Sequence, residues 1–183
     1  MAVTLKQTET PPASWPFVSR LSEAALAVPQ VALWSRIEAW CSHRWGARPV
    51  VWVVEGPGAW EPPLTPAAVS AIEKWDGAAW LADSPPDSPY GGYDLPSEGP
   101  WRVTATVGDT VVPEPVAEAF RRLAEYVSDG MTPSLHKGRS GAKSTSYTVD
   151  GLTVMFTRDP NWMARAMANS GAGDLLRPYR KVR

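Results

Sequence analysis

The segment of this 183-residue chain that comes closest to a known chemical motif lies at residues 138–144. It reads Gly-Arg-Ser-Gly-Ala-Lys-Ser, which contains the residue types of a phosphate-binding loop. That loop needs four residues between its glycines and a strand before it. Here two residues separate Gly138 from Gly141, and a helical pattern precedes them. We therefore expect a solvated basic loop and no nucleotide site.

Other residues that could carry chemistry are few. The only cysteine, Cys41, lies two positions from His43 on one expected helix, so the two side chains point to different faces. Cys41 falls on the apolar face, which favours a buried, inert thiol. His136 is the only other histidine, and two isolated imidazoles lack metal-ligand spacing. No pattern pairs two carboxylates for acid–base catalysis. The sequence predicts no enzyme, no catalytic residue, no metal and no cofactor.

Tryptophan and proline are unusually frequent, with ten and nineteen residues. Five of the tryptophans fall in one segment expected to form a small sheet: Trp52, Trp60, Trp75, Trp80 and Trp101. An exposed row of indoles can bind sugar, but tryptophan on a small sheet more often fills the core because each ring buries a large area. We predict a core or protein-interface role for these rings ahead of a carbohydrate platform.

Charge is unevenly distributed along the chain, whose formal net charge is -1. Residues 1–130 carry nine Lys/Arg and sixteen Asp/Glu, whereas residues 131–183 carry nine Lys/Arg and three Asp. The last ten residues combine four cations with four large apolar side chains. A purely solvated tail needs no such apolar groups, so this pattern favours a docking segment. No apolar run is long enough to span a membrane, and the first residues lack a signal-peptide pattern, so we expect a cytoplasmic protein.

The elements that position these residues predict an α+β fold. Apolar periodicity indicates helices at 16–28, 31–45 and 113–129, with a Pro/Trp-rich antiparallel β insertion at 49–108 between the second and third helices. Together they form a main domain at 15–130, preceded by a flexible N-terminus at 1–14. The fold class we expect is mainly helical, with a small β insertion, a C-terminal hairpin and a docking tail.

Two Asp-Gly pairs predict tight hairpin turns, one at Asp76-Gly77 and one at Asp150-Gly151. The second turn belongs to a region at 131–173, which we expect to contain the basic loop, a β-hairpin and a short helix beginning near Asp159-Pro160. The docking segment at 174–183 follows.

The order of these pieces resembles the head–tail connector, or adaptor, proteins of long-tailed phages and of phage-derived gene transfer agents. Residues 37–50 are similar to the family's helix that ends in an aromatic residue, Gly and Arg before a strand. Residues 64–77 resemble its hydrophobic-Pro step into a hairpin. Residues 101–116 match its strand, glycine and Val-Pro-x-Pro helix start, and residues 175–180 resemble its Leu-Leu-x-Pro-Tyr/Trp-Arg ending.

This resemblance implies a structural protein of the virion neck. Family members form a ring, commonly a dodecamer of identical subunits, below the portal protein. The ring extends the DNA channel, contacts passing DNA without sequence specificity and joins the head to the stopper or tail. It implies assembly in the bacterial cytoplasm, residence at the head–tail junction and no contact with a membrane. Acidic and basic parts of neighbouring subunits can meet across the interfaces of such a ring.

Two sets of site residues follow, the first from the resemblance and the second from the charge of the basic loop. The portal-docking set is the C-terminal segment: Leu175, Leu176, Arg177, Pro178, Tyr179, Arg180, Lys181, Val182 and Arg183. The second set lies in the basic loop and contacts either channel DNA or a neighbouring subunit: Lys137, Arg139 and Lys143.

Two other functions stay open from the sequence. One is a non-virion interaction module, with a Trp-rich sheet that binds peptide or sugar and a basic tail that binds nucleic acid. The other is an enzyme with an unrecognised carboxylate site, for which no substrate is visible.

Overall fold

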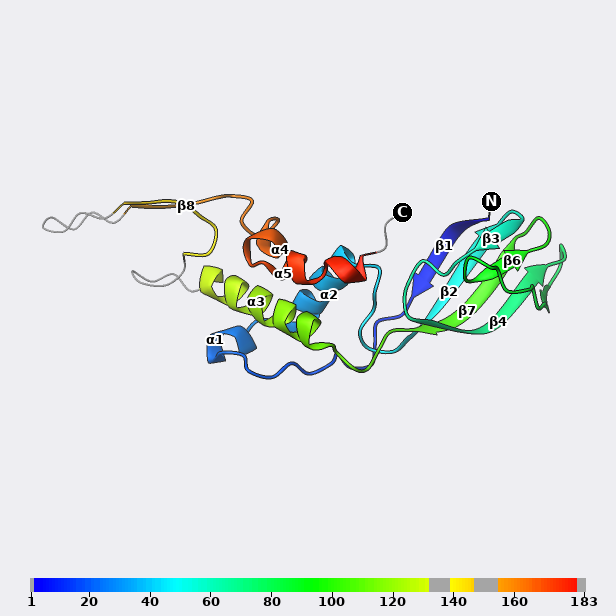
Figure 1. Cartoon of the computed structure of the whole chain (residues 1–183), viewed down its shortest axis with the longest axis horizontal. Helices are drawn as coiled ribbons and strands as arrows, with labels where there is room; N and C mark the ends of the chain where they lie inside the picture. The colour runs from blue at the N-terminus through cyan, green and yellow to red at the C-terminus, as the bar shows by residue number, and fades with distance from the viewer. Residues whose placement is uncertain (1, 132–138, 147–154, 181–183) are drawn as a thin grey trace, which may run out of the picture. The chain divides into compact units, whose positions relative to one another are not determined.

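The computed structural model describes residues 2–131, 139–146 and 155–180 (Figure 1). They form two compact units that interleave along the chain. The β unit comprises Met1–Ser14 and Ser42–Val111, and the helical unit comprises Trp15–Cys41 and Val112–Arg183. Strands and bridges account for 33% of the described residues and helices for 27%. The prediction of a mainly helical connector fold with a small β insertion is therefore wrong.

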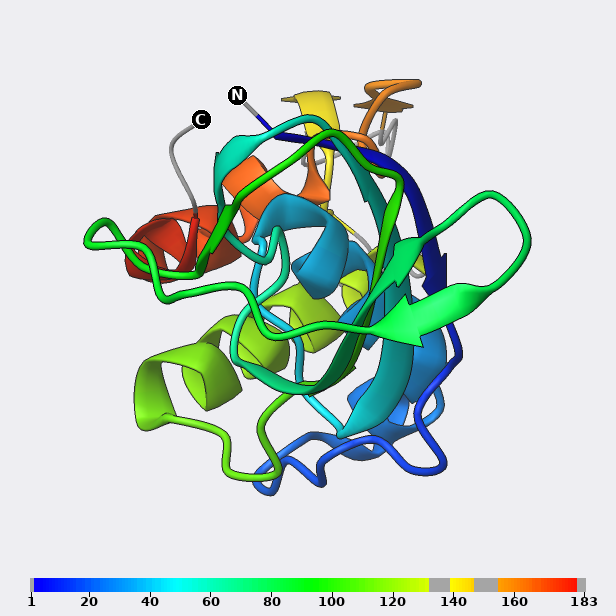
Figure 2. The same cartoon turned by 90° about the vertical axis from the view of Figure 1, so that its right-hand side faces the viewer.

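The β unit is built on a five-stranded antiparallel sheet in the order β1-β2-β7-β4-β5. A two-stranded sheet, β3-β6, accompanies it. Figure 2 turns this unit toward the viewer and shows β1, in dark blue, following one margin of the curved sheet. The strands are β1 (Val3–Glu9), β2 (Arg48–Glu55), β3 (Gly58–Trp60), β4 (Ala67–Trp75), β5 (Trp80–Ala82), β6 (Tyr93–Leu95) and β7 (Trp101–Val107).

The N-terminal segment, expected to be flexible, forms the edge strand β1. Its polar sequence gives little strand signal, but its side chains are the partners of buried groups. The indole N–H of Trp52 donates to the Gln7 Oε1 at 2.9 Å, and that of Trp60 donates to the Thr4 Oγ1 at 2.9 Å. A buried indole needs such an acceptor, so tryptophans far along the sequence hold this strand in place.

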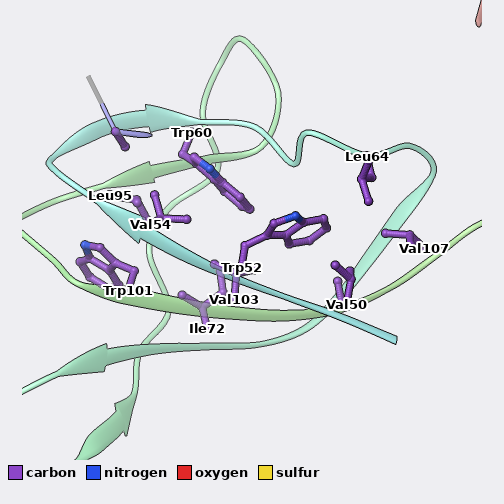
Figure 3. Packing of buried hydrophobic residues seen from close by; sticks show 12 residues of the cluster. Val50, Trp52, Val54, Trp60, Leu64, Ile72, Leu95, Trp101, Val103 and Val107 are labelled. Carbon is purple, nitrogen blue, oxygen red and sulfur yellow. The ribbon is translucent and has the colours of Figure 1, made fainter. Parts of the chain in front are cut away.

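The core of the β unit lies between the two sheets (Figure 3). Trp52 and Trp60 point toward each other there, with ring centroids 5.7 Å apart in an edge-to-face arrangement. Trp101 is fully buried, and its indole N–H donates to the Ser97 carbonyl at 3.1 Å. The tryptophan-rich segment therefore builds a unit with its own core and is not a small insertion in a helical domain. This is why the expected fold class is wrong.

The hairpin between β4 and β5 turns one residue later than the Asp-Gly pair predicts. The Asp76 N–H donates to the Ala79 carbonyl at 3.1 Å, so Gly77 and Ala78 occupy the centre of the turn. Gly77 has φ +107°, a conformation that favours glycine. The Asp76 carboxylate accepts hydrogen bonds from the Ala79 and Ala78 N–H groups at 2.7 and 2.8 Å, and these bonds lower its pKa.

The helical unit is organised around α3, which contacts each of the other helices of the unit (Figure 1). Its apolar face is buried, and Phe120 packs against Trp34 of α2 with ring centroids 4.8 Å apart. Trp34 also stacks on Trp15. The helices are α1 (Glu23–Leu26), α2 (Gln30–Trp40), α3 (Glu114–Met131), α4 (Ala166–Asn169), α5 (Ala172–Leu175) and the 3-10 helix η1 (Arg177–Tyr179).

Two helices are shorter than the sequence pattern suggests. Residues 15–22 are not helical: Arg20 has φ +63°, and the Ser22 hydroxyl caps α1 by accepting from the Ala25 N–H at 3.1 Å. The Glu125 carboxylate of α3 accepts bonds from the Ser22 N–H and hydroxyl, which fixes this late start. The second helix ends at Trp40 because residues 42–45 bond to other strands, where His43 bridges to Thr65.

A two-stranded antiparallel hairpin extends from the helical unit. It pairs β8 (Ala142–Ser146) with β9 (Met155–Arg158). The predicted turn at Asp150-Gly151 lies outside the described residues. At the base, the Arg158 guanidinium donates to the Gly130 carbonyl at 2.6 Å and lies 4.9 Å from the centre of the Trp162 ring. Among the described helices, none is long and apolar enough to cross a bilayer.

Candidate functional site

The C-terminal segment is folded onto the helical unit. Its residues form α5 and η1, and α5 contacts α3 (Figure 1). Leu176 lies between the two short helices and is fully buried, at 0% exposure. Leu175 and Tyr179 are half-buried. The described apolar residues of the segment therefore attach it to its own chain.

The described cations of this segment lie at the surface. Arg177 is 78% exposed and lies 3.1 Å from the equally exposed Asp174 carboxylate. Pro178 and Arg180 are also exposed. Lys181, Val182 and Arg183 lie outside the described residues. Of the nine residues that the resemblance assigns to portal docking, three therefore offer an exposed surface in the structure.

Trp40 of α2 holds the segment from two sides. The Arg180 guanidinium lies 4.9 Å from the centre of the Trp40 ring, a cation–π distance. Gly173 lies against the same ring, and a β-carbon there would be 3.0 Å from the ring atom Cζ2. Gly173 therefore allows the Trp40 ring to approach closely, and these contacts connect the surface that carries Arg177, Pro178 and Arg180 to α2. We call these three residues the arginine surface.

The second set of candidate residues falls at the start of the β8-β9 hairpin. Arg139 and Lys143 are exposed, and Lys137 lies outside the described residues. The chain turns between them, because the Ala142 N–H donates to the Arg139 carbonyl at 2.9 Å. The Asp129 carboxylate accepts a bond from the Ser140 N–H at 2.8 Å and fixes the turn to α3. Residues 139–144 thus form a turn that leads into a strand.

The acidic and basic residues are distributed unequally between the two units. The β unit carries five Lys/Arg and ten Asp/Glu, a formal charge of -5. The helical unit carries thirteen Lys/Arg and nine Asp/Glu, a formal charge of +4. Each unit therefore presents a different sign of charge to a partner.

The β unit contains an open groove of about 410 Å³. Its apolar lining comes from Leu64, Val69 and Tyr93, and the exposed carboxylates Glu61 and Asp87 also line it. The segments that form it are the loop before β4, the first half of β4 and the turn before β6. Sequence reasoning missed this groove because two separate segments build it, residues 61–69 and 87–93, and no local pattern marks such a site.

Two of the five sheet tryptophans are at the surface. Trp75 and Trp80 are half-buried on the β4-β5 hairpin, with ring centroids 5.3 Å apart and planes tilted by 58°. The Arg102 guanidinium covers Trp80 at 4.7 Å and donates two bonds to Glu73, at 2.6 and 2.7 Å. These bonds lower the pKa of Glu73 and raise that of Arg102. Tilted rings with an arginine over one of them do not form a flat sugar-binding platform.

The remaining chemically active side chains have structural roles. The Cys41 thiol is buried and donates to the Ile37 carbonyl at 3.1 Å. The His43 Nε2 lies 3.1 Å from the Asp109 carboxylate. His136 lies outside the described residues. Across the part of the chain that the structure describes, no three His, Cys, Asp or Glu side chains gather to hold a metal ion.

Comparison with known proteins gives no assignment. The chain matches no protein-family model, no curated protein and no solved structure. The function must therefore be argued from the motif order, the surfaces and the charges described above.

Proposed function

We propose that this chain is a head–tail connector subunit of a phage or a gene transfer agent particle. It forms a ring of identical subunits below the portal, extends the DNA channel and joins the head to the stopper or tail. The proposal is not tied to the mainly helical fold that we first expected. Its main support is the arginine surface, a basic, exposed and well-anchored patch at the chain end where the resemblance to connectors assigns portal docking.

A second support is the junction between β7 and α3. The connector-like motif of strand, glycine and Val-Pro-x-Pro corresponds to the end of β7, Gly108 and the start of α3. Gly108 has φ +104°, and a β-carbon there would lie 2.5 Å from the Gly46 carbonyl oxygen. The glycine and the helix-starting prolines thus have physical reasons to occupy these positions.

The opposite charges of the two units support a ring. A heterologous contact places one surface of a subunit against a different surface of its neighbour, and such contacts close into rings when the rotation allows. An acidic β unit and a basic helical unit supply complementary surfaces for this kind of contact.

The test is binding to the portal protein of the same particle. We expect Arg177→Glu and Arg180→Glu each to weaken retention of the full chain on immobilised portal by about tenfold or more, because each replaces a docking cation with an anion. The matched control is Arg165→Glu. Arg165 is also exposed, at 64%, and also pairs with an aspartate, Asp159, at 3.3 Å.

The readings of this experiment are distinct. Loss of portal binding in the two C-terminal variants, with retention in Arg165→Glu, supports the docking surface. Equal binding by all three variants and the unmodified chain would contradict it. Full deletion of residues 174–183 is a poor test because it removes the buried Leu176.

The alternative of a non-virion module that binds sugar or peptide has less support. Trp52, Trp60 and Trp101 are core residues, and the two half-buried rings are not coplanar. Titration of the full chain with oligosaccharides, followed by tryptophan fluorescence, tests this function; saturable quenching that is lost in Trp80→Ala would favour it.

A further inference from the structure

The β8-β9 hairpin is an arm without a core of its own. Its described strand residues with assigned burial are exposed except Arg158, which is half-buried at the base. Met155 is 63% exposed. An isolated two-stranded ribbon is marginally stable in water, and strands of this kind normally pack on a third element. The arm therefore needs a partner surface.

The two faces of β9 differ. Phe156 and Arg158 lie two residues apart on one face, where the guanidinium is 5.4 Å from the centre of the phenyl ring. Met155 and Thr157 lie on the other face, and both are exposed. Of the described residues of the arm, Met155 is thus the most exposed large apolar side chain, at 63% against 39% for Phe156.

The groove of the β unit has complementary properties. β7 pairs with β4 along one side, beginning at Ala67. On the other side of β4, β5 pairs with residues 73–75. Among the described residues, the start of β4 therefore has no strand partner on that second side. Ala67 and Val69 of this outer stretch line the groove. A bulge between Val69 and Ala71 limits regular strand addition to Ala67–Val69. The site therefore suits a short strand with an apolar side chain.

Charge favours the same pairing. Arg139 and Lys143 are exposed at the start of the arm, and Glu61 and Asp87 are exposed along the groove. Opposite charges at the margin of an apolar contact select the partner and its orientation. The volume of about 410 Å³ is ample for a methionine side chain and part of a strand.

We propose that β9 of one copy adds to the Ala67–Val69 edge of β4 in a second copy, with Met155 entering the groove. Backbone hydrogen bonds between the two strands hold the contact, and the side chain gives it specificity. The proposal extends the ring assembly proposed above, since each copy both donates an arm and offers a groove. It names the surfaces in contact and needs no portal.

The test uses mixtures of variants of the full chain that each carry one introduced cysteine. One introduced cysteine lies in the hairpin and the other at the groove, so a cross-link between them can form only between copies. Met155→Cys is mixed at high protein concentration with a tagged Ala67→Cys chain under mild oxidation. The control partner is tagged Leu81→Cys, which places a thiol on β5 at a position more exposed than Ala67. Native Cys41 is buried and does not compete. We expect a mixed disulfide dimer with Ala67→Cys and only background with Leu81→Cys.

The outcomes decide between occupants of the groove. A mixture that gives no more dimer than the control would overturn the proposal. A double variant, Met155→Cys with Ala67→Cys, that closes only within one chain would assign the groove to the chain's own arm and would also overturn it. As a second measurement, Met155→Glu should weaken self-association by about tenfold in sedimentation, whereas Leu81→Glu should not.

Failure here is distinguishable from failure of the connector function. Portal binding and particle location depend on the C-terminal surface and do not require this contact. Absence of the cross-link together with retained portal binding would remove the arm–groove contact alone.

Discussion

The core of the β unit centres on three tryptophans, whereas the helical unit buries one face of a single long helix. In the β unit, Trp52, Trp60 and Trp101 each donate an indole hydrogen bond within the same unit. The helical unit instead carries the features that extend outward, namely the arginine surface and the β8-β9 arm. The β unit is therefore held together by its tryptophan core, while the helical unit carries both the arginine surface and the arm named in our proposals.

The two units also differ in how they hold charge. In the acidic β unit, Glu9 of β1 pairs with Arg44 at 2.8 Å and with the buried Arg48 at 3.0 Å, which ties the edge strand to the segment before β2. In the basic helical unit, Arg177 and Arg165 pair with aspartates only at the surface. Exposed pairs contribute little to stability, and Arg165 and Arg177 remain accessible at the surface.

The largest expected effect is in the tryptophan core. Trp52→Ala should lower the free energy of unfolding by about 3–5 kcal/mol, because it leaves a cavity and removes the donor to Gln7. Urea titration followed by far-UV circular dichroism measures the change. The control, Trp75→Ala on the half-buried hairpin, should cost at most about 1–2 kcal/mol. Equal losses in the two variants would mean that the β unit is not built around Trp52.

The C-terminal segment gives the next effect. Leu176→Ala should destabilise the chain by about 2–5 kcal/mol, because its side chain is fully buried. Leu175→Ala, at the half-buried neighbouring position, should cost about 1 kcal/mol or less. Thermal unfolding compares the two. A neutral Leu176→Ala would show that Leu176 does not anchor the segment to the helical unit.

A smaller effect is expected where α3 meets the base of the arm. A β-carbon at Gly130 would lie 2.2 Å from the Trp162 ring, which is also packed by Arg158 and Tyr126. Gly130→Ala should therefore destabilise by about 1–3 kcal/mol, despite the better helix propensity of alanine. In a Trp162→Leu background the same substitution should become nearly neutral. Chemical denaturation of the four chains gives this double-mutant cycle, and additivity of the two changes would contradict the contact.

The smallest expected effect is on the pH dependence of stability, and it involves one carboxyl group in each unit. Arg102 lowers the pKa of Glu73 in the β unit, and Arg122 followed by Arg121 lowers that of Glu118 in the helical unit. A depressed carboxyl pKa contributes stability that is present above the usual value of 4.5 and is lost as the pH falls through the lowered value. Stability should thus fall less steeply below pH 4.5 in Glu73→Gln and Glu118→Gln than in the unmodified chain. Urea midpoints across an acid pH series measure these slopes, and unchanged slopes would remove the two carboxyls as the cause.

The sequence predicted the helices and strands whose own residues carry a clear apolar or β-branched pattern. The apolar face of α3 and the β-branched runs of β2 and β7 lie close to their expected positions. The β4-β5 hairpin was also visible, although Asp76 closes its turn one residue later than expected.

The elements that depend on distant partners were not predictable. β1 has a polar sequence, and its order comes from indoles about fifty residues away. The start of α1 is set by Glu125, 103 residues further along. The groove combines two separate segments, and the burial of Leu176 reflects packing that an apolar-basic tail pattern cannot reveal. The sequence predicted a docking segment, which stays a prediction, but it did not predict the division of that segment into a buried anchor and an exposed surface.

The central claim is that this chain works at the junction of a particle's head and tail. The direct measurement is antibody labelling of nuclease-resistant particles, purified from the culture that produces the chain and viewed by electron microscopy. The connector proposal predicts label at the head–tail junction. Intact particles without label, with the chain found only in the free cytosolic fraction, would contradict it.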